Sequence, residues 1–233
     1  MSGFRDIHAH FVYGVDDGAQ TKEKMEAMLD MAHENGVTSL YATPHITPGV
    51  YPFDEALFAQ HFEEAQAYCR QKGYPITLHA GAEIMYTPMI RRCAEEKMLP
   101  LLGDTEHILM EFVPDVSYRE IEEAVSLMER SGYSVILAHI ERYDCLYRKK
   151  NAYRLREEHD VRFQVNCGTV IDRRGFLRDR CITKWFRDGL ISYVASDAHG
   201  CTRRPCRMKQ AYEVLCQRVG EECAARVTGL HHS

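Results

Sequence analysis

The sequence predicts an α/β fold in which about seven βα units form a closed or nearly closed barrel. Short apolar runs alternate with longer helical patterns, and no linker interrupts them. The apolar runs, such as SVILAHI and HILMEF, are nearly continuous, which indicates a parallel sheet buried on both faces. An open doubly wound sheet is the alternative architecture. The chain has 233 residues, and we expect residues 1–233 to form a single domain.

The elements follow from residue type and spacing. Strands are predicted at Phe4–His10, Thr38–Ala42, Ile76–Ile84, His107–Phe112, Tyr133–His139, Arg162–Asn166 and Tyr193–Ser196. Helices are predicted at Thr21–Asn35, Asp54–Lys72, Tyr118–Ser131, Lys149–His159, Arg178–Asp188 and Pro205–Val219, where Ala, Glu, Met, Leu and Arg are frequent. Glycines follow four of these helical patterns, at the position where a left-handed residue often ends a helix: Gly36, Gly73, Gly132 and Gly189.

Composition excludes several protein classes. The net charge of −5 argues against a general nucleic-acid binder, which is usually basic. No apolar run is long enough to predict a membrane span, and no signal peptide is visible. The nine cysteines show no CxxC spacing, so we expect a cytoplasmic chain with free thiols.

A thiol phosphatase is one alternative that the cysteines raise. A Cys-x5-Arg pattern, typical of thiol-based tyrosine phosphatases, occurs from Cys167 to Arg173, from Cys181 to Arg187 and from Cys201 to Arg207. About one such match is expected by chance, so the pattern is weak. None of the three segments supplies the small, glycine-rich loop between strand and helix that cradles a phosphate.

Ionisable side chains stand at the carboxyl ends of almost all the predicted strands. In a barrel these ends meet on one face, where such enzymes carry their active sites. A single buried histidine is more often a hydrogen-bonded core residue than a ligand, but nine such side chains at successive strand ends point to a metal site. They are His8, His10, Asp17, His45, Glu83, Glu111, His139, Asp197 and His199.

The spacing of these residues has physical content. Side chains alternate along a strand, so His8 and His10 point the same way, as do Asp197 and His199. The first and last strands would be neighbours where the barrel closes. Asp6 precedes His8 by two residues and is expected to orient an imidazole from behind the metal ligands.

The charge of the predicted site suits phosphate. Its four carboxylates and three divalent cations would leave a charge of +2. Arg142 and Arg204 follow His139 and His199 closely, and guanidinium groups bind phosphate through two hydrogen bonds. A surface ion pair is the alternative role for each arginine.

The motifs DIHAH, VDDG, ATPH, GAEI, LMEF, AHIERY and SDAH, in this order from Asp6 to about Tyr212, resemble the PHP (polymerase and histidinol phosphatase) superfamily. More narrowly, the chain resembles bacterial manganese-dependent tyrosine-protein phosphatases of capsule and exopolysaccharide gene clusters. The resemblance implies a distorted seven-stranded PHP barrel and a trinuclear site for divalent metal ions, with Mn expected and Fe or Zn as alternatives. It also implies a phosphotyrosyl protein substrate, an autophosphorylating bacterial tyrosine kinase, and is compatible with a homo-oligomer.

The resemblance further implies a role for each site residue. His8, His10, Glu83 and Asp197 would hold the first metal. Glu83, Glu111 and His139 would hold the second, and Asp17, His45 and His199 the third. Arg142 and Arg204 match the phosphate-contacting arginines of the family. The expected chemistry is direct hydrolysis by a metal-bridged hydroxide, since metal binding lowers the pKa of water from about 15.7 to about 7.

The sequence departs from the family in two places. Arg204 is followed by Pro205 and Cys206 where relatives have two prolines, and the chain after Gly220 is short. His231 and His232 are expected to belong to the tail and not to the site.

Other functions stay open at this point. A PHP phosphatase of a small metabolite such as histidinol phosphate would use the same metals. An amidohydrolase commonly uses a bridging lysine at a strand end, and no predicted strand here ends in lysine. A non-catalytic binding module would not need the complete set of ligands that this sequence has.

Overall fold

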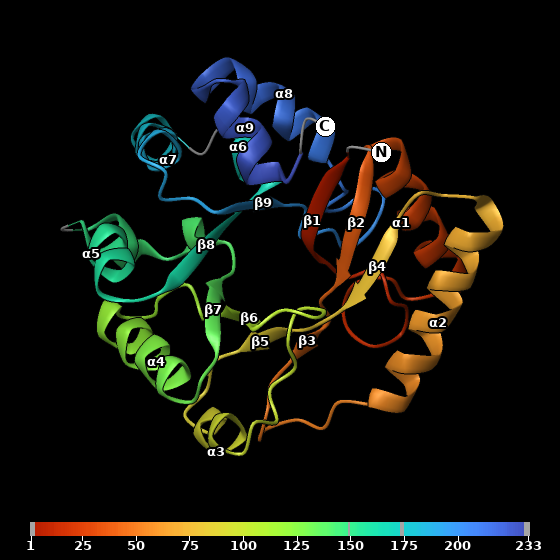
Figure 1. The fold of residues 1–233 in the computed structure, drawn as a ribbon, viewed down its shortest axis with the longest axis horizontal. Coiled ribbons are helices and arrows are strands. Elements are labelled where there is room, and N and C mark those ends of the chain that lie inside the picture. Colours follow the sequence, from red (N-terminus) through yellow and green to blue (C-terminus); the bar gives the residue numbers. More distant parts are fainter. Residues whose placement is uncertain (1–2, 149, 173–174, 231–233) are drawn as a thin grey trace.

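The computed structural model describes residues 3–148, 150–172 and 175–230. In these ranges nine parallel strands curl into a half-barrel, and the helices lie on its outer side (Figure 1). One ladder has the order β1-β2-β4 and the other the order β3-β5-β6-β7-β8-β9. The strands are β1 (Phe4–Ala9), β2 (Val37–Ala42), β3 (His45–Ile46), β4 (Thr77–Ala80), β5 (Glu83–Met85), β6 (His107–Glu111), β7 (Ser134–Leu137), β8 (Val161–Asn166) and β9 (Tyr193–Ala195).

The described residues form nine strands and not the predicted seven, because one predicted strand is divided and one short strand is added. The predicted strand Ile76–Ile84 is divided into β4 and β5, and the short β3 follows β2. Gly81 lies between β4 and β5, where an added Cβ would lie 2.7 Å from Leu102 Cδ2, so a larger residue would have to displace the leucine side chain. β2 pairs with β4 and β3 pairs with β5, so both segments pass from one ladder to the other together.

The first and last strands are neighbours, as predicted. Ala9 and Ala198 form a parallel bridge. The amide of Asp197 donates to the His8 carbonyl at 2.8 Å, and that of His10 donates to the Ala198 carbonyl at 2.9 Å. The two predicted i, i+2 pairs therefore meet at this seam.

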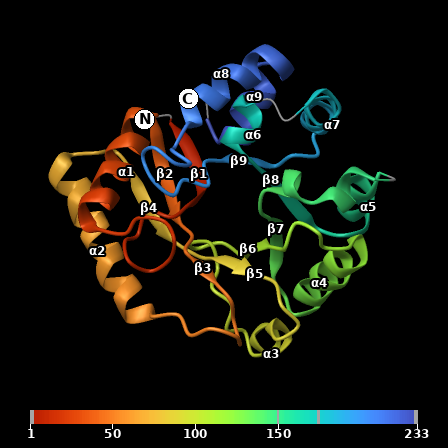
Figure 2. The same cartoon turned by 180° about the vertical axis from the view of Figure 1, so that it is seen from behind.

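Helices cover the outer side of the strands in both views (Figures 1 and 2). The α-helices are α1 (Lys22–Glu34), α2 (Glu55–Lys72), α3 (Ile90–Glu95), α4 (Tyr118–Arg130), α5 (Asn151–Glu158), α6 (Cys167–Ile171), α7 (Phe176–Arg187), α8 (Met208–Val219) and α9 (Glu221–Thr228). Side chains of Thr21, Asp54 and Ser117 cap α1, α2 and α4. No helix among the described residues is both long and apolar enough to span a membrane.

Three helices were not predicted. α3 and α6 are short, and α9 lies in the segment after Gly220, where it packs against α8 and β9. Lys149, the first residue of the fourth predicted helix (observed as α5), lies outside the described residues, as do His231 and His232.

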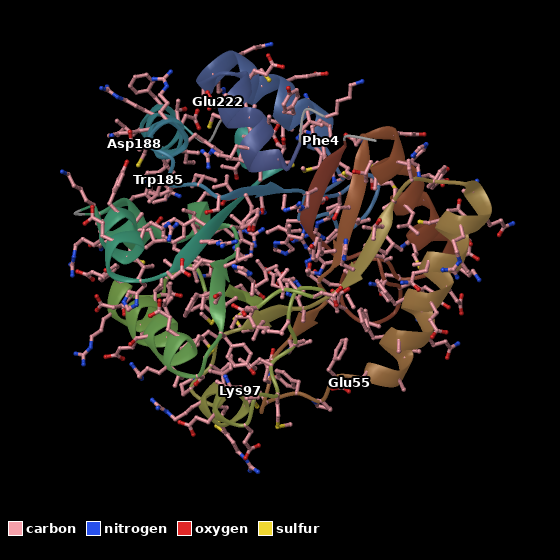
Figure 3. The ribbon with its side chains drawn as sticks, viewed as in Figure 1. Phe4, Glu55, Lys97, Trp185, Asp188 and Glu222 are labelled. Carbon is pink, nitrogen blue, oxygen red and sulfur yellow. The ribbon has the colours of Figure 1, made fainter. Side chains whose placement is uncertain are left out.

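The buried apolar side chains form two clusters. The larger cluster lies between strands and helices, while a smaller one contains Ile7, Leu109 and Ile136 from three different strands. Since these strands surround the barrel interior, the smaller cluster fills it below the carboxyl ends of the strands. Figure 3 shows nitrogen- and oxygen-bearing side chains gathered in the middle of the strands, while the labelled Glu55 and Asp188 lie on the periphery.

Candidate metal centre

The structure brings all nine predicted side chains together at the carboxyl ends of the strands. They form three overlapping groups in which the potential ligand atoms lie within 4.8 Å of one another, with His139 beside them. The exposed fraction of the side chain rises from 0% for Glu83 to 34% for His45 and 63% for Asp17, so the centre opens to solvent on one side. The groups are His8, His10, Glu83 and Asp197; His45, Glu83 and Glu111; and His10, Asp17, His45 and His199.

A local irregularity in β1 turns the first histidines inward. Ile7 belongs to the inner apolar cluster, yet the next residue, His8, also points to the centre, where its Nε2 lies 3.0 Å from Glu83 Oε2. Strict alternation would not allow both. The register of β1 against β2 shifts between Asp6 and Ala9, and such a bulge can re-aim a side chain toward an active site.

Left-handed backbone conformations position three further site residues. His139 follows the inward-facing Ala138 directly, and its φ of 33° and ψ of 54° turn the imidazole inward as well. Asp197 and Arg204 each have a φ of 51°. This conformation is strained for residues other than glycine and is concentrated at functional sites.

The distances within the first group fit a shared cation. His8 Nε2 lies 3.1 Å from His10 Nε2, and these two atoms lie 3.0 and 3.2 Å from Glu83 Oε2. They also lie 3.4 and 3.6 Å from Asp197 Oδ1. Ligand atoms about 2.1 Å from one ion lie roughly 3.0–3.4 Å apart in octahedral or tetrahedral geometry.

The second and third groups share residues with the first. Glu83 Oε2 lies 3.1 Å from His45 Nδ1, and Glu111 Oε1 lies 3.0 Å from the same nitrogen. His139 Nε2 lies 2.7 Å from Glu83 Oε1 and 3.4 Å from Glu111 Oε2. At the exposed side, Asp17 Oδ1 lies 3.4 Å from His45 Nε2 and 3.2 Å from His199 Nε2.

Unpaired buried atoms also favour cation binding. Glu83 Oε2 and His199 Nε2 are buried and have no hydrogen-bond partner, although charged neighbours surround them. A buried polar atom without a partner is costly, and a bound cation would supply one. The residues present therefore fit a cluster of divalent metal ions.

The electrostatics of the centre rest on imidazole–carboxylate pairing. Burial alone would raise the pKa of Glu83, but the neighbouring imidazoles of His8, His10 and His139 hold it well below its usual range. Burial lowers the pKa of His139, but Glu111 and Glu83 outweigh this effect and raise it to about 9. Burial and the neighbouring His10 lower the pKa of His199 to about 4.

Both predicted arginines lie at the exposed side of the centre. Arg142 Nη2 donates to Asp197 Oδ2, and Arg204 Nη2 donates to Asp17 Oδ2 at 3.2 Å. Arg204 Nη1 also lies 3.7 Å from Asp197 Oδ2. Their side chains are 33% and 35% exposed, so each arginine is partly accessible to solvent.

The predicted role of Asp6 is wrong in detail. Its Oδ1 accepts from the backbone amides of Ser196 and His8, at 2.9 and 3.4 Å, and not from an imidazole. Asp6 thus ties β1 to the segment after β9. Burial raises its pKa.

Three polar residues near the centre were not predicted. Asp16 Oδ2 lies 2.7 Å from His10 Nδ1 and accepts from the His45 amide at 3.1 Å, so Asp16 orients one imidazole and fixes the position of another. The DDG motif contains Asp16 and Asp17 side by side, and the sequence predicts a site role for Asp17 alone. Gln164 and Asn166 on β8 also contact the candidate ligands. Two buried amides at i, i+2 in an apolar strand were the available signal.

The cysteines do not fit a thiol mechanism. Cys167 is fully buried, and burial raises its pKa well above the usual value. Burial also raises the pKa of Cys181 and of Cys201, which disfavours the thiolate that such chemistry needs. Arg173 lies outside the described residues. All nine cysteines are described, and all are free.

Comparison with known proteins finds one matching family model and several similar proteins. Residues 4–230 match the family described as capsular polysaccharide synthesis, CpsB/CapC. The tyrosine-protein phosphatase CpsB of Streptococcus pneumoniae is 33% identical over 227 residues, covering 94% of this chain and 92% of the relative. The tyrosine-protein phosphatase YwqE of Bacillus subtilis is 26% identical over 223 residues, covering 96% and 88%.

Solved structures show the same fold. A structure from work on YwqE of Bacillus subtilis and CpsB of Streptococcus pneumoniae, described as unique metal-dependent tyrosine phosphatases, superimposes with a TM-score of 0.85 at 27% identity. It covers 96% of this chain and 91% of the other. Histidinol phosphate phosphatase of Lactococcus lactis, with Zn, L-histidinol and phosphate, has a TM-score of 0.59 at 13% identity, covering 97% and 95%. The latter likeness shows the fold alone.

Proposed function

Because this chain belongs to the CpsB/CapC family of capsular polysaccharide synthesis proteins, we propose that it is a metal-dependent protein-tyrosine phosphatase. One observation carries the proposal. Eight histidine and carboxylate side chains converge in three overlapping groups with His139 beside them, and two arginines stand at the open side. Such a centre suits the hydrolysis of a phosphoric monoester.

The centre would hold three divalent ions, with manganese proposed and iron or zinc as alternatives. His8, His10, Glu83 and Asp197 would hold the first; Glu83, Glu111 and His139 the second; and Asp17, His45 and His199 the third. When bound, such ions lower the pKa of water to about 7 and so supply a nucleophile at neutral pH.

The side chains of this protein orient the phosphate and stabilise its charge. Arg142 and Arg204 approach the centre from its open side, where they would donate to the equatorial oxygens of a phosphoryl group. Both guanidinium groups contact Asp197 Oδ2. Transfer of these donors to phosphate would place them where negative charge develops. The leaving phenolate, with a pKa of about 10, needs little protonation.

The proposed substrate is a phosphotyrosyl protein, namely an autophosphorylated bacterial tyrosine kinase of capsule or exopolysaccharide synthesis. We propose that the reaction takes place in the cytoplasm. The names of the relatives support this substrate, since those proteins are tyrosine-protein phosphatases. Hydrolysis of histidinol phosphate is the second candidate, because a histidinol phosphate phosphatase shares the fold. An amidohydrolase activity is disfavoured, because Glu83 occupies the bridging place where that class commonly has a lysine.

A substrate comparison tests the proposed function. The chain is stripped of metal with EDTA and reloaded with Mn²⁺, Zn²⁺, Fe²⁺ or Mg²⁺, and kcat/KM is measured on a phosphotyrosyl peptide and on histidinol phosphate. We expect the stripped chain to be inactive, Mn²⁺ to restore activity, and the peptide to be the better substrate. Faster turnover of histidinol phosphate, or full activity without metal, would contradict the proposal.

The pKa of His139 predicts how pH acts on the metal-free protein. Its folded pKa of about 9 lies above the ordinary 6.5. The imidazolium therefore stabilises the metal-free fold fully below pH 6.5, and this contribution is lost as pH rises toward 9. Metal binding needs the neutral imidazole, so affinity changes in the opposite direction.

Thermal unfolding across this pH interval measures both effects. With EDTA, the Tm should fall as pH rises from 6.5 to about 9. With saturating Mn²⁺, the stabilisation relative to EDTA should grow over the same interval. The pairing of His139 with Glu83 and Glu111 would be refuted by a Tm in EDTA that rises with pH.

A further inference from the structure

β8 lies between two strands that lead to candidate ligands, but it carries none of the nine itself. It pairs with β7, which leads to His139, and with β9, which leads to Asp197. Two of its neutral amides, Gln164 and Asn166, face the centre and are 0% and 7% exposed. Buried amides of this kind persist only where their hydrogen bonds are satisfied.

The hydrogen bonds of these amides connect three candidate ligands. Gln164 Oε1 accepts from the His139 backbone amide at 2.8 Å and lies 3.2 Å from His8 Nδ1. Gln164 Nε2 donates to Asn166 Oδ1 at 2.7 Å. Asn166 Nδ2 then donates to Asp197 Oδ2, also at 2.7 Å.

The polarity of this chain of hydrogen bonds is fixed at both ends. The His139 backbone amide can only donate, so the facing Gln164 atom is the oxygen, and Nε2 of the same side chain points to Asn166. The ionised carboxylate of Asp197 can only accept, so Asn166 presents its nitrogen there. Both amide orientations therefore follow from chemistry and not from choice.

One consequence concerns the tautomer of His8. Gln164 Oε1 has no proton to donate, so His8 Nδ1 must carry the proton. In the neutral imidazole the lone pair is then on Nε2, the atom that lies 3.1 Å from His10 Nε2 and 3.0 Å from Glu83 Oε2. A histidine that binds metal through one nitrogen commonly donates the other N–H to an outer partner.

We propose that Gln164 and Asn166 are positioning residues that fix the Nδ1–H tautomer of His8 and orient the Asp197 carboxylate, so that His8 Nε2 and Asp197 Oδ1 face the first ion. This inference rests on the proposed metal site. Asn166 also gives Asp197 Oδ2 a neutral donor that stays in place when Arg142 moves from the same oxygen to a phosphate.

Metal affinity and the His8 proton test the inference together. Gln164→Met keeps the size of the side chain but removes the acceptor, and it should weaken Mn²⁺ binding about 10–100-fold in a competition titration of the full chain. In the diamagnetic Zn²⁺-loaded protein, the hydrogen-bonded Nδ1–H signal of His8 in ¹H–¹⁵N NMR should be lost. Gln164→Glu, which keeps an acceptor toward His8, should retain this signal. Asn166→Leu should weaken Mn²⁺ binding and also retain it.

A matched control separates positioning from stability. Thr169→Val removes another buried hydrogen bond, from Thr169 Oγ1 to Glu141, without touching a candidate ligand. It should leave Mn²⁺ affinity and the His8 signal unchanged. Wild-type Mn²⁺ affinity in Gln164→Met, or an equal loss in Thr169→Val, would overturn the inference.

The outcome is distinguishable from failure of the proposed function. The wild-type chain could bind Mn²⁺ without hydrolysing a phosphotyrosyl peptide, while Gln164→Met still weakens Mn²⁺ binding. The positioning role would then be supported and the proposed phosphatase activity would be refuted. If the wild-type chain is active and Gln164→Met binds Mn²⁺ as tightly, only the inference falls.

Discussion

Glu83→Gln should abolish most activity and lower the metal content of the purified chain. Glu83 belongs to two of the three groups, and its Oε2 lies about 3 Å from nitrogens of three histidines. The amide removes a negative charge and replaces an acceptor with a donor. Loss of an outer partner alone costs about 10–100-fold, so loss of a shared ligand should lower kcat/KM by at least about 10³-fold.

Glu141→Gln is the matched control for this variant. Glu141 is a second buried glutamate near the strand ends, but it belongs to none of the groups. Its Oε1 accepts from the Asn166 amide and from Thr169 Oγ1, which a glutamine oxygen can also do. The metal content, measured by mass spectrometry, should stay near the wild-type value, and so should the turnover rate. Full metal content in Glu83→Gln, or an equal loss in Glu141→Gln, would argue against a shared ligand.

Arg204→Ala should lower kcat/KM by about 10²–10³-fold, the effect of removing one preorganised donor to the transition state. Metal content should stay unchanged, because Arg204 contacts the carboxylates of Asp17 and Asp197 but offers no atom to a cation. Arg204→Lys should recover only part of the activity, since an ammonium group lacks the planar fork of guanidinium.

Arg203→Ala provides the comparison for Arg204. This exposed neighbour has the same side chain and lies one residue away. Its loss should leave kcat/KM and metal content near wild type. If Arg204→Ala lost metal and turnover equally, Arg204 would be structural and its predicted contact with phosphate would be wrong.

The site could be predicted further than the fold details because its chemistry is visible in single residues. An ionisable side chain at the end of an apolar strand stands out, and eight such positions share three groups in the structure, with His139 beside Glu83 and Glu111. What sequence could not show is how they turn inward. The register shift in β1 and the left-handed conformations of His139 and Asp197 arise from the folded backbone and leave no pattern in residue types.

The missed elements have different causes. β3 has only two residues, too few for alternation to appear, and the break at Gly81 is visible only once its contact with Leu102 is known. Gln164 and Asn166 carry no charge, so their i, i+2 spacing in an apolar strand is a weaker signal than an ionisable side chain at a strand end. Asp16 and Asp17 are adjacent and chemically alike, and tertiary contacts alone assign them different roles.

The central claim is that the nine side chains around Glu83 hold a cluster of divalent ions. Diffraction from Mn²⁺-loaded crystals at the manganese absorption edge locates such ions directly. We predict three anomalous peaks, one in each group that includes His8, Glu111 or Asp17. An ion at the separate group of Glu122, Glu158 and His159, with none beside Glu83, would contradict it.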